Sequence, residues 1–203
     1  MSKQKEKIIA VRDDDFHLTF AKWSDFPILK ETFNSLLENA PLEKKRFFIS
    51  WMYRNNPSMK IRTGQFLARL SLIPFFAKII KTLYPFGYAI ILKCISKDGE
   101  IAGSGSIYNF THRSDDNGFA AIGARWIIDK YQNIGIGGSF LMDNLEKIAK
   151  QEGVTRLRGM IDLDNAPSLH TLEKHGWKII ETEKDMMRYK TGPHNLKEIV
   201  KDL

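Results

Sequence analysis

The sequence predicts a mixed α/β domain, because β-hairpins come first and strands alternate with helices afterwards. The runs 88–95 and 101–110 are strongly β-prone and are joined by an Asp98-Gly99 turn, which is typical of an antiparallel hairpin. From residue 119 onward the pattern becomes strand, helix, strand, helix, strand. We therefore expect a mostly antiparallel sheet that is joined to a parallel pair and flanked by helices.

Length and composition indicate one domain over residues 1–203. The chain has 203 residues, of which 43% are hydrophobic, and this is enough for a sizeable core. Its single cysteine, Cys94, excludes a disulfide framework and favours a reducing compartment. Residues 1–7 are polar and only residues 8–11 are apolar behind them, so we expect no signal peptide and a cytoplasmic protein. The net charge of +7 favours anionic ligands, but its even spread along the chain does not indicate a nucleic-acid partner.

The N-terminal third predicts two strands and two helices. The strands are expected at residues 8–11 and 18–23. The first helix begins after Ser24 or Asp25, either of which can cap it, and carries its apolar positions on one face. These positions are Phe26, Leu29, Phe33, Leu36 and Leu37. A second helix is expected at residues 42–53.

The segment 55–87 is an inserted or elaborated helical segment in the N-terminal half. Its apolar stretch, 65–83, has an uncharged core of only residues 70–77, which includes Pro74. A membrane-spanning helix needs about 20 apolar residues, so we exclude one here. Three interpretations stay open: a helix packed on the domain, a lid over a substrate groove, and a basic amphipathic segment at a membrane surface.

The rest of the chain is organised around residues 120–139. An apolar run, 120–128, suits a strand that is buried on both faces, and a polar turn follows at 129–133. A bend with three glycines, Gly135, Gly137 and Gly138, leads into a helix over residues 136–151. A glycine bend between a strand and a helix exposes N–H groups that have no partner within the helix, at the positive end of its dipole. We interpret this bend as a diphosphate-binding cradle.

Beyond the cradle helix, Gly153 ends the helix and a strand follows at residues 156–162. A second helix is expected at 165–175, with Gly176 as its stop. Residues 177–181 and 185–190 are expected to form a closing antiparallel pair. The basic tail from residue 193 is expected to carry at most a short helix.

The spacing of the cradle separates it from other phosphate-binding loops. No lysine follows Gly137 or Gly138, so it is not a Walker-type loop, and Phe140 stands where a dinucleotide fingerprint requires glycine. The pattern Gln132-x-x-Gly135-x-Gly137 resembles the Gln/Arg-x-x-Gly-x-Gly signature of the GNAT superfamily of N-acetyltransferases. A second block, from Asn165 to Gly176-Trp177, is similar to the family's later motif, in which an Asn opens a helix and a Gly-aromatic pair closes it.

The resemblance covers about residues 88–190 and implies a sheet whose two central strands splay apart after a bulge to admit acetyl-CoA as co-substrate. By position, the backbone N–H groups of residues 133–139 would hold the diphosphate, with added hydrogen bonds from Gln132 and Ser139. Asn165 is either a coenzyme contact or only a helix N-cap, and Ser168 is either a contact or a packing residue. The implied coenzyme-binding set is Ile127, Ile128, Gln132, Asn133, Ile134, Gly135, Ile136, Gly137, Gly138, Ser139, Asn165 and Ser168.

The family's catalytic residues do not carry over. Leu172 stands where a Tyr commonly protonates the leaving sulfur, and Met160 stands where the ribosomal-protein branch has a Glu base. Three substitutes can be named: Asp162 at a strand end, His170 on the second helix, and Tyr108 on the hairpin. Each also has an ordinary structural interpretation, as a solvated strand-end acid, a surface His and a core Tyr.

His170 and His175 lie five residues apart and diverge around the helix, so we do not expect both to serve. No group of His, Cys or carboxylate residues has the spacing of metal ligands, and we expect no metal.

Three functions follow from these patterns. The first is transfer of the acetyl group of acetyl-CoA to a primary amine of a small molecule or protein. The second, suggested by Leu172 and Met160, is a catalytically degenerate acyl-CoA-binding or interaction module. The third is peripheral membrane association through residues 65–83, although we do not expect a membrane partner. The amine acceptor stays open, as does the oligomeric state, with a homodimer among the options.

Overall fold

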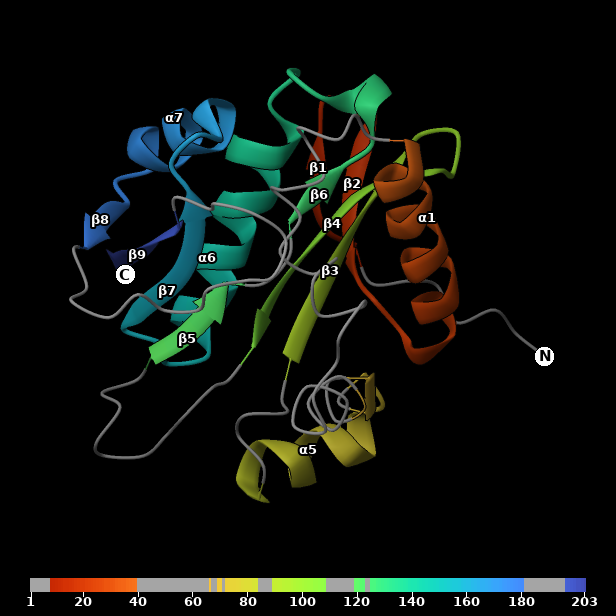
Figure 1. Cartoon of the computed structure of the whole chain (residues 1–203). Coiled ribbons are helices and arrows are strands. Elements are labelled where there is room, and N and C mark those ends of the chain that lie inside the picture. Colours follow the sequence, from red (N-terminus) through yellow and green to blue (C-terminus); the bar gives the residue numbers. More distant parts are fainter. Residues whose placement is uncertain are drawn as a thin grey trace.

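The computed structural model describes residues 8–39, 66, 69–70, 72–83, 89–108, 119–122, 125–180 and 196–203. Within these residues, nine strands belong to one sheet in the order β1-β2-β3-β4-β5-β7-β9-β8, with β6 paired to β4 (Figure 1). Neighbouring strands are antiparallel except β5 and β7, which are parallel. The predicted architecture is therefore confirmed.

The N-terminal half of the sheet consists of two hairpins. The first joins β1 (Ile8–Arg12) to β2 (Phe16–Phe20), and the second joins β3 (Ala89–Ser96) to β4 (Ile101–Tyr108). The predicted Asp-Gly turn closes the second hairpin, with Gly99 in the left-handed region at φ 82°.

Helix α1 (Phe26–Asn39) follows a short 3-10 turn, η1 (Trp23–Asp25), as its sequence predicts. The Asp25 carboxylate accepts a hydrogen bond from the Lys22 N–H at 2.7 Å and pairs with the Lys93 ammonium at 2.9 Å. The side chains of Lys93 and Asp25 are only 6% and 16% exposed. Removing one partner of such a buried pair costs about 3–5 kcal/mol, so the pair ties the start of α1 firmly to β3.

The sheet separates two apolar layers. Leu92 and Cys94 of β3 lie in the larger cluster, which also contains the inner face of α6 (Leu141–Gln151), whereas Ile91 packs with α1. Successive residues of a strand point to opposite faces, so α1 and α6 cover opposite faces of the sheet, as Figure 1 shows.

The expected single strand over residues 120–128 is wrong, because the run divides into β5 (Phe119–Ile122) and β6 (Trp126–Ile127). Both pieces pair with β4, where Ile107 faces Ile122 and Ser104 faces Trp126. Two residues lie between these positions on β4 but three lie between them on the other strand, so the run contains one extra residue. This offset of one residue does not interrupt the apolar character of the run, and composition alone therefore does not reveal it.

The C-terminal half contains β7 (Arg156–Asp162), α7 (Ala166–Lys174), β8 (Lys178–Ile180) and β9 (Leu196–Asp202). The expected tail or short helix after residue 193 is therefore wrong, because β9 lies between β7 and β8. Ile199 and Val200 are adjacent and both buried, which suits a strand covered on both faces. The proposed strand at 185–190 lies outside the described residues.

Helix α5 (Pro74–Leu83) lies beyond the end of the sheet at which β3 begins (Figure 1). Ile80 is buried, whereas Phe75, Phe76 and Ile79 are exposed. Among the residues that the structure describes, no helix is long and apolar enough to cross a membrane. The helix expected at 42–53 and most of the segment 55–73 lie outside the described residues.

The packing of the larger apolar cluster can be tested at Cys94 of β3. Its side chain is fully buried, and burial raises the pKa of its thiol to about 12, against a smaller opposite effect of the nearby Arg12 charge. We expect Cys94 to resist alkylation by iodoacetamide at pH 8 in the folded protein, because the thiolate is the reacting form. Mass spectrometry should show no adduct in the native protein and one adduct after unfolding in urea. Stoichiometric labelling without denaturant would contradict this packing.

Candidate functional site

A tight turn connects β6 to α6 and forms the cradle. It begins with the 3-10 turn η3 (Asp129–Tyr131), passes through residues 132–135, and enters a π-helical turn, η4 (Ile136–Phe140), that continues into α6. Asn133 and Gly135 both have positive φ, at 63° and 83°. A left-handed backbone favours glycine and, among residues with a Cβ, asparagine, which explains both residues.

The N–H groups of the cradle are not used within the described protein. The amides of residues 133–138 donate no hydrogen bond to any described group, whereas Gln132 N–H bonds the Asp129 carbonyl and Phe140 N–H bonds the Gly135 carbonyl. These amides stand at the N-terminus of η4 and α6, where the helix dipole adds positive potential. The turn therefore has the properties of an anion site.

The side chain of Gln132 stabilises the turn from within. Its Nε2 donates to the Ile127 carbonyl at 3.0 Å and to Asp129 Oδ1 at 2.7 Å. These two bonds join the end of β6 to the start of the cradle. The glutamine of the motif thus has a structural role in this chain, because its amide nitrogen is occupied by the turn.

Two hairpins hold the turn in place from outside. The Tyr131 hydroxyl donates to Glu100 Oε2 at 2.9 Å, and Lys130 forms an ion pair with the same carboxylate. The ring of Phe16 on β2 packs edge-on against Tyr131, with 5.2 Å between centroids. The cradle is therefore fixed to both N-terminal hairpins, through β2 of the first and the turn of the second.

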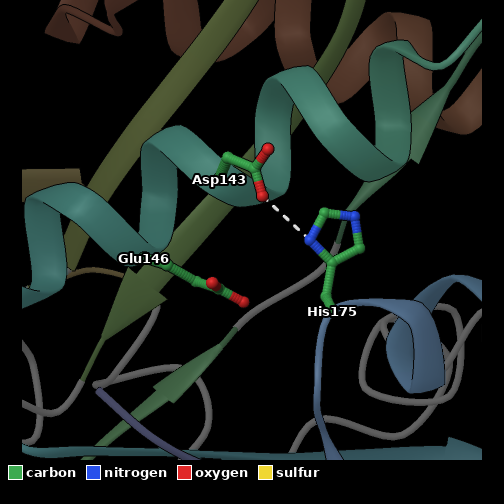
Figure 2. Close-up of side chains that lie close together, drawn as sticks. All are labelled: Asp143, Glu146 and His175. Carbon is green, nitrogen blue, oxygen red and sulfur yellow. Dashed lines mark ion pairs between the residues drawn. The ribbon is translucent and has the colours of Figure 1, made fainter.

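Helix α7 closes the opposite side of the cradle. A Cβ on Gly138 would lie 2.9 Å from Thr171 Cγ2 and 3.8 Å from His175 Nε2, so only glycine allows this approach. His175 Nδ1 lies 2.8 Å from a carboxylate oxygen of Asp143 on α6, as Figure 2 shows. This pair connects the end of α7 to the helix that begins at the cradle.

Asp143, Glu146 and His175 together could supply three metal ligands, since their ligand atoms lie within 4.8 Å of one another (Figure 2). Glu146, however, is already fully engaged. Its Oε1 accepts from Trp177 Nε1 at 2.9 Å, and its Oε2 pairs with the Lys201 ammonium. A cation would have to compete with that ammonium group, so the cluster is better explained as a partly buried link between α6, the end of α7 and β9.

The central strands diverge next to the cradle. β5 and β7 are paired only from Phe119–Arg156 to Ala121–Arg158. Beyond this point β6 pairs with β4, and β7 pairs with β9 alone among the described strands. The expected splay of the two central strands is therefore confirmed, and Ile127 lies on the β6 side of it, beside Gly137.

The second motif forms the start of α7. Asn165 Oδ1 accepts the Ser168 N–H at 3.4 Å, so Asn165 caps the helix, and Ser168 lies half-buried in the first turn. Leu172, in the position of the family's Tyr, is 6% exposed and belongs to the apolar core. Gly176 ends the helix at φ 75°.

The three candidate catalytic residues do not come together. Asp162 is buried at the end of β7, where its Oδ1 accepts the Asp164 N–H at 3.1 Å. Tyr108 ends β4 at the level of Arg158, which places it four residues, or about 13 Å, along the strands from Asp162. His170 is exposed on α7. Of the three, Asp162 lies on the strand that borders the splay.

Other residues at the cradle were not found by sequence reasoning. Arg12 of β1 is the main one, since a Cβ on Gly135 would lie 3.2 Å from both of its terminal nitrogens. Glu100, Thr171 and the Asp143–His175 pair are the others. Arg12 and Glu100 come from distant parts of the chain and no local motif marks them, whereas Thr171 and His175 lie within the second motif, which assigns them no contact with the cradle.

Comparison with known proteins agrees with this geometry. A sequence model of the acetyltransferase (GNAT) family matches residues 59–177, which is more than half of the chain. This chain belongs to the GNAT family. It is therefore an acetyltransferase by family, and the resemblance of its two motifs is confirmed. A search among curated proteins finds no match.

Solved structures share the GNAT fold at low sequence identity. RimL, a ribosomal L7/L12 alpha-N-protein acetyltransferase in complex with coenzyme A, has a TM-score of 0.67 at 17% identity and covers 97% of this chain and 98% of its own. The Salmonella typhimurium protein yncA, with its cofactor acetyl-CoA, has a TM-score of 0.63 at 12% identity, with 93% and 94% coverage. A GNAT acetyltransferase from Streptococcus pneumoniae has a TM-score of 0.63 at 18% identity, with 93% and 100% coverage. These similarities establish the fold.

The contact between Gly138 and Thr171 can be tested by a double-mutant cycle. Gly138→Ala places a methyl group against Thr171 Cγ2, whereas Thr171→Ser removes that methyl and keeps the hydroxyl, which donates to the Pro167 carbonyl at 2.9 Å. We expect Gly138→Ala to lower the free energy of unfolding by about 1 kcal/mol more in the wild type than in the Thr171→Ser background, as for other close pairs. Urea unfolding of the four proteins measures this difference. If the two substitutions change the free energy of unfolding additively, Thr171 of α7 does not contact the cradle at Gly138.

Proposed function

We propose that this GNAT protein transfers the acetyl group of acetyl-CoA to a primary amine of a small molecule or protein. The observation that carries the proposal is the set of unpaired amides at residues 133–138, which face no described acceptor at the N-terminus of α6. A diphosphate has the charge and the oxygen acceptors to satisfy them. The family supplies the reaction class, and the cradle supports the co-substrate.

The residues present fit coenzyme A. Gly135 and Gly137 keep side chains out of the turn, and the guanidinium of Arg12 adds positive charge beside Gly135. The amides of residues 133–139 would hold the diphosphate. Ser139 is exposed beside them and its hydroxyl would add a donor, whereas the Gln132 amide nitrogen is occupied within the turn.

The splay between β6 and β7 would receive the extended arm of the co-substrate. Beyond Arg158, β7 has a paired strand on only one edge within the described sheet, and the backbone of β6 borders the opening from the other side. An extended chain with amide groups can pair with such edges as an additional strand does. Ile127 and Ile128 would line this arm on one side, and the start of α7 at Asn165 and Ser168 on the other.

The acetyl thioester supplies the electrophile, and the protein must deliver an unprotonated amine to it. An alkyl amine has a pKa near 10, so a base or a water chain has to remove a proton. We propose Asp162 for this role, because it ends the strand that borders the splay and follows Met160 on the same side of the strand. Tyr108 and His170 stay candidates with less geometric support.

Binding and turnover together test the proposed function. Isothermal titration with acetyl-CoA should show saturable binding at or below about 1 mM, in the usual range for enzyme substrates. Release of free thiol should then be followed with a panel of small amines, polyamines and peptides that present an N-terminal amine or a lysine. Cys94 is buried and should give no background in this assay. Absence of binding at millimolar acetyl-CoA would contradict the proposal.

A second function has one observation in its favour. Leu172 is buried in the core and offers no proton donor at the position where the family has its Tyr. The protein would then be a catalytically degenerate module that binds acyl-CoA. Binding of acetyl-CoA without thiol release above hydrolysis, for every amine in the panel, would support the module and contradict the enzyme.

Asp162→Asn tests the proposed base. The amide oxygen of Asn can still accept the Asp164 N–H, so the turn is preserved while the carboxylate is lost. We expect kcat to fall by about 100-fold to 10,000-fold, the usual contribution of a general base, with little change in the Kd of acetyl-CoA.

Asp164→Asn is the matched control, because Asp164 is exposed two residues further along the same turn. We expect it to keep the wild-type kcat. An unchanged kcat in Asp162→Asn would show that Asp162 has only a structural role, in the turn that follows β7.

A further inference from the structure

Arg12 occupies an unusual electrostatic position. It ends β1, opposite Phe16 of β2, and its two terminal nitrogens lie 3.2 Å from the point where a Cβ would stand on Gly135. Phe16 in turn packs on Tyr131, so the end of the first hairpin is docked on the cradle by an aromatic contact as well. The guanidinium is therefore held against the turn by the fold.

The charge of Arg12 is poorly compensated. One terminal nitrogen, Nη1, is buried and has no hydrogen-bond partner among the described residues. Its ion-pair partner in the described chain is Asp13, through Nε at 3.4 Å, and the Asp13 side chain is 81% exposed. An exposed pair of this kind contributes at most about 1 kcal/mol. Asp15 of the same turn is already engaged by Lys97 at 2.7 Å.

Two sources of positive potential thus meet at Gly135. One is the guanidinium with its buried, unpartnered N–H, and the other is the start of α6 with its unpaired amides. Placing them together costs free energy unless an anion lies between them, since like charges repel and a buried donor without an acceptor costs about 1–3 kcal/mol. A diphosphate can accept from both, and guanidinium groups bind phosphate oxygens in a planar, two-pronged geometry.

We propose that Arg12, contributed by the first β-hairpin, binds the diphosphate of the co-substrate. This inference rests on the proposed function of the cradle. It assigns to the hairpin a part in ligand binding that neither sequence motif contains. Arg12 is a binding residue in this proposal, because its guanidinium lies beside Gly135 of the cradle.

The test measures binding alone, by titration of the full chain with coenzyme A and with dephospho-coenzyme A, which lacks the 3′-phosphate but keeps the diphosphate. Arg12→Ala should raise the Kd of both ligands by the same factor, about 10-fold to 100-fold, as expected for loss of charge-assisted hydrogen bonds. Arg12→Lys keeps the charge without the fork and should give a smaller increase for both. This variant also decides the question if Arg12→Ala does not fold.

Arg156→Ala is the charge-matched control. Arg156 begins β7 and pairs with Asp202, so its removal changes the net charge equally at a distance from the cradle. We expect it to leave both Kd values within about twofold, because exposed charges beyond a Debye length of about 8–10 Å are screened at physiological salt.

Three results would overturn the inference. Unchanged Kd values in Arg12→Ala would show that the guanidinium does not touch the ligand. Weaker binding of coenzyme A with unchanged binding of dephospho-coenzyme A would assign Arg12 to the 3′-phosphate instead. An equal increase of both Kd values in Arg156→Ala would show that the effect comes from the net charge of the protein and not from a contact with the ligand. Failure of the wild-type protein to bind either ligand is a different outcome, because it would remove the proposed function itself.

Discussion

The pairing of β4 with both β5 and β6 is the constraint on which the site depends. β4 pairs with both pieces of the central strand, with an offset of one residue between Ile122 and Trp126, whereas the pairing of β5 with β7 ends at Ala121–Arg158. β7 is held on its other edge by β9. The short parallel pair of β5 and β7 is therefore followed by a splay between β6 and β7, and the cradle, which follows β6, lies beside this splay.

The cradle is also a meeting point of three distant segments. The β1–β2 hairpin supplies Arg12 and Phe16, the β3–β4 turn supplies Glu100, and α7 supplies Thr171 and His175. Each contact fixes the turn from a different direction, which keeps its amides oriented before any ligand arrives. Preorganisation of this kind raises affinity, because the ligand does not have to order the loop.

Local chemistry explains how much of this could be predicted from sequence. Gly135, Gly153 and Gly176 mark backbone positions with positive φ, and Asn165 marks a helix start, so the turn, the helix ends and both motifs were predicted at the right residues. The extra residue that divides β5 from β6 leaves no compositional trace in an apolar run. β9 and Arg12 were missed for another reason. Their roles depend on which strand lies beside which, and a local pattern does not encode that.

The loss of the family's Tyr at Leu172 has a limited consequence for the proposed acetyl transfer. A thiol has a pKa near 8.5, so a thiolate leaves without much help, and a general acid contributes at most about 100-fold to 10,000-fold, or about 3–5 kcal/mol. Holding two reactants in the correct geometry contributes more, about 7–11 kcal/mol. Leu172 is packed in the core and helps to fix α7 against the cradle. The larger contribution of positioning therefore favours a protein whose activity depends mainly on binding of the co-substrate by the cradle and less on proton transfer.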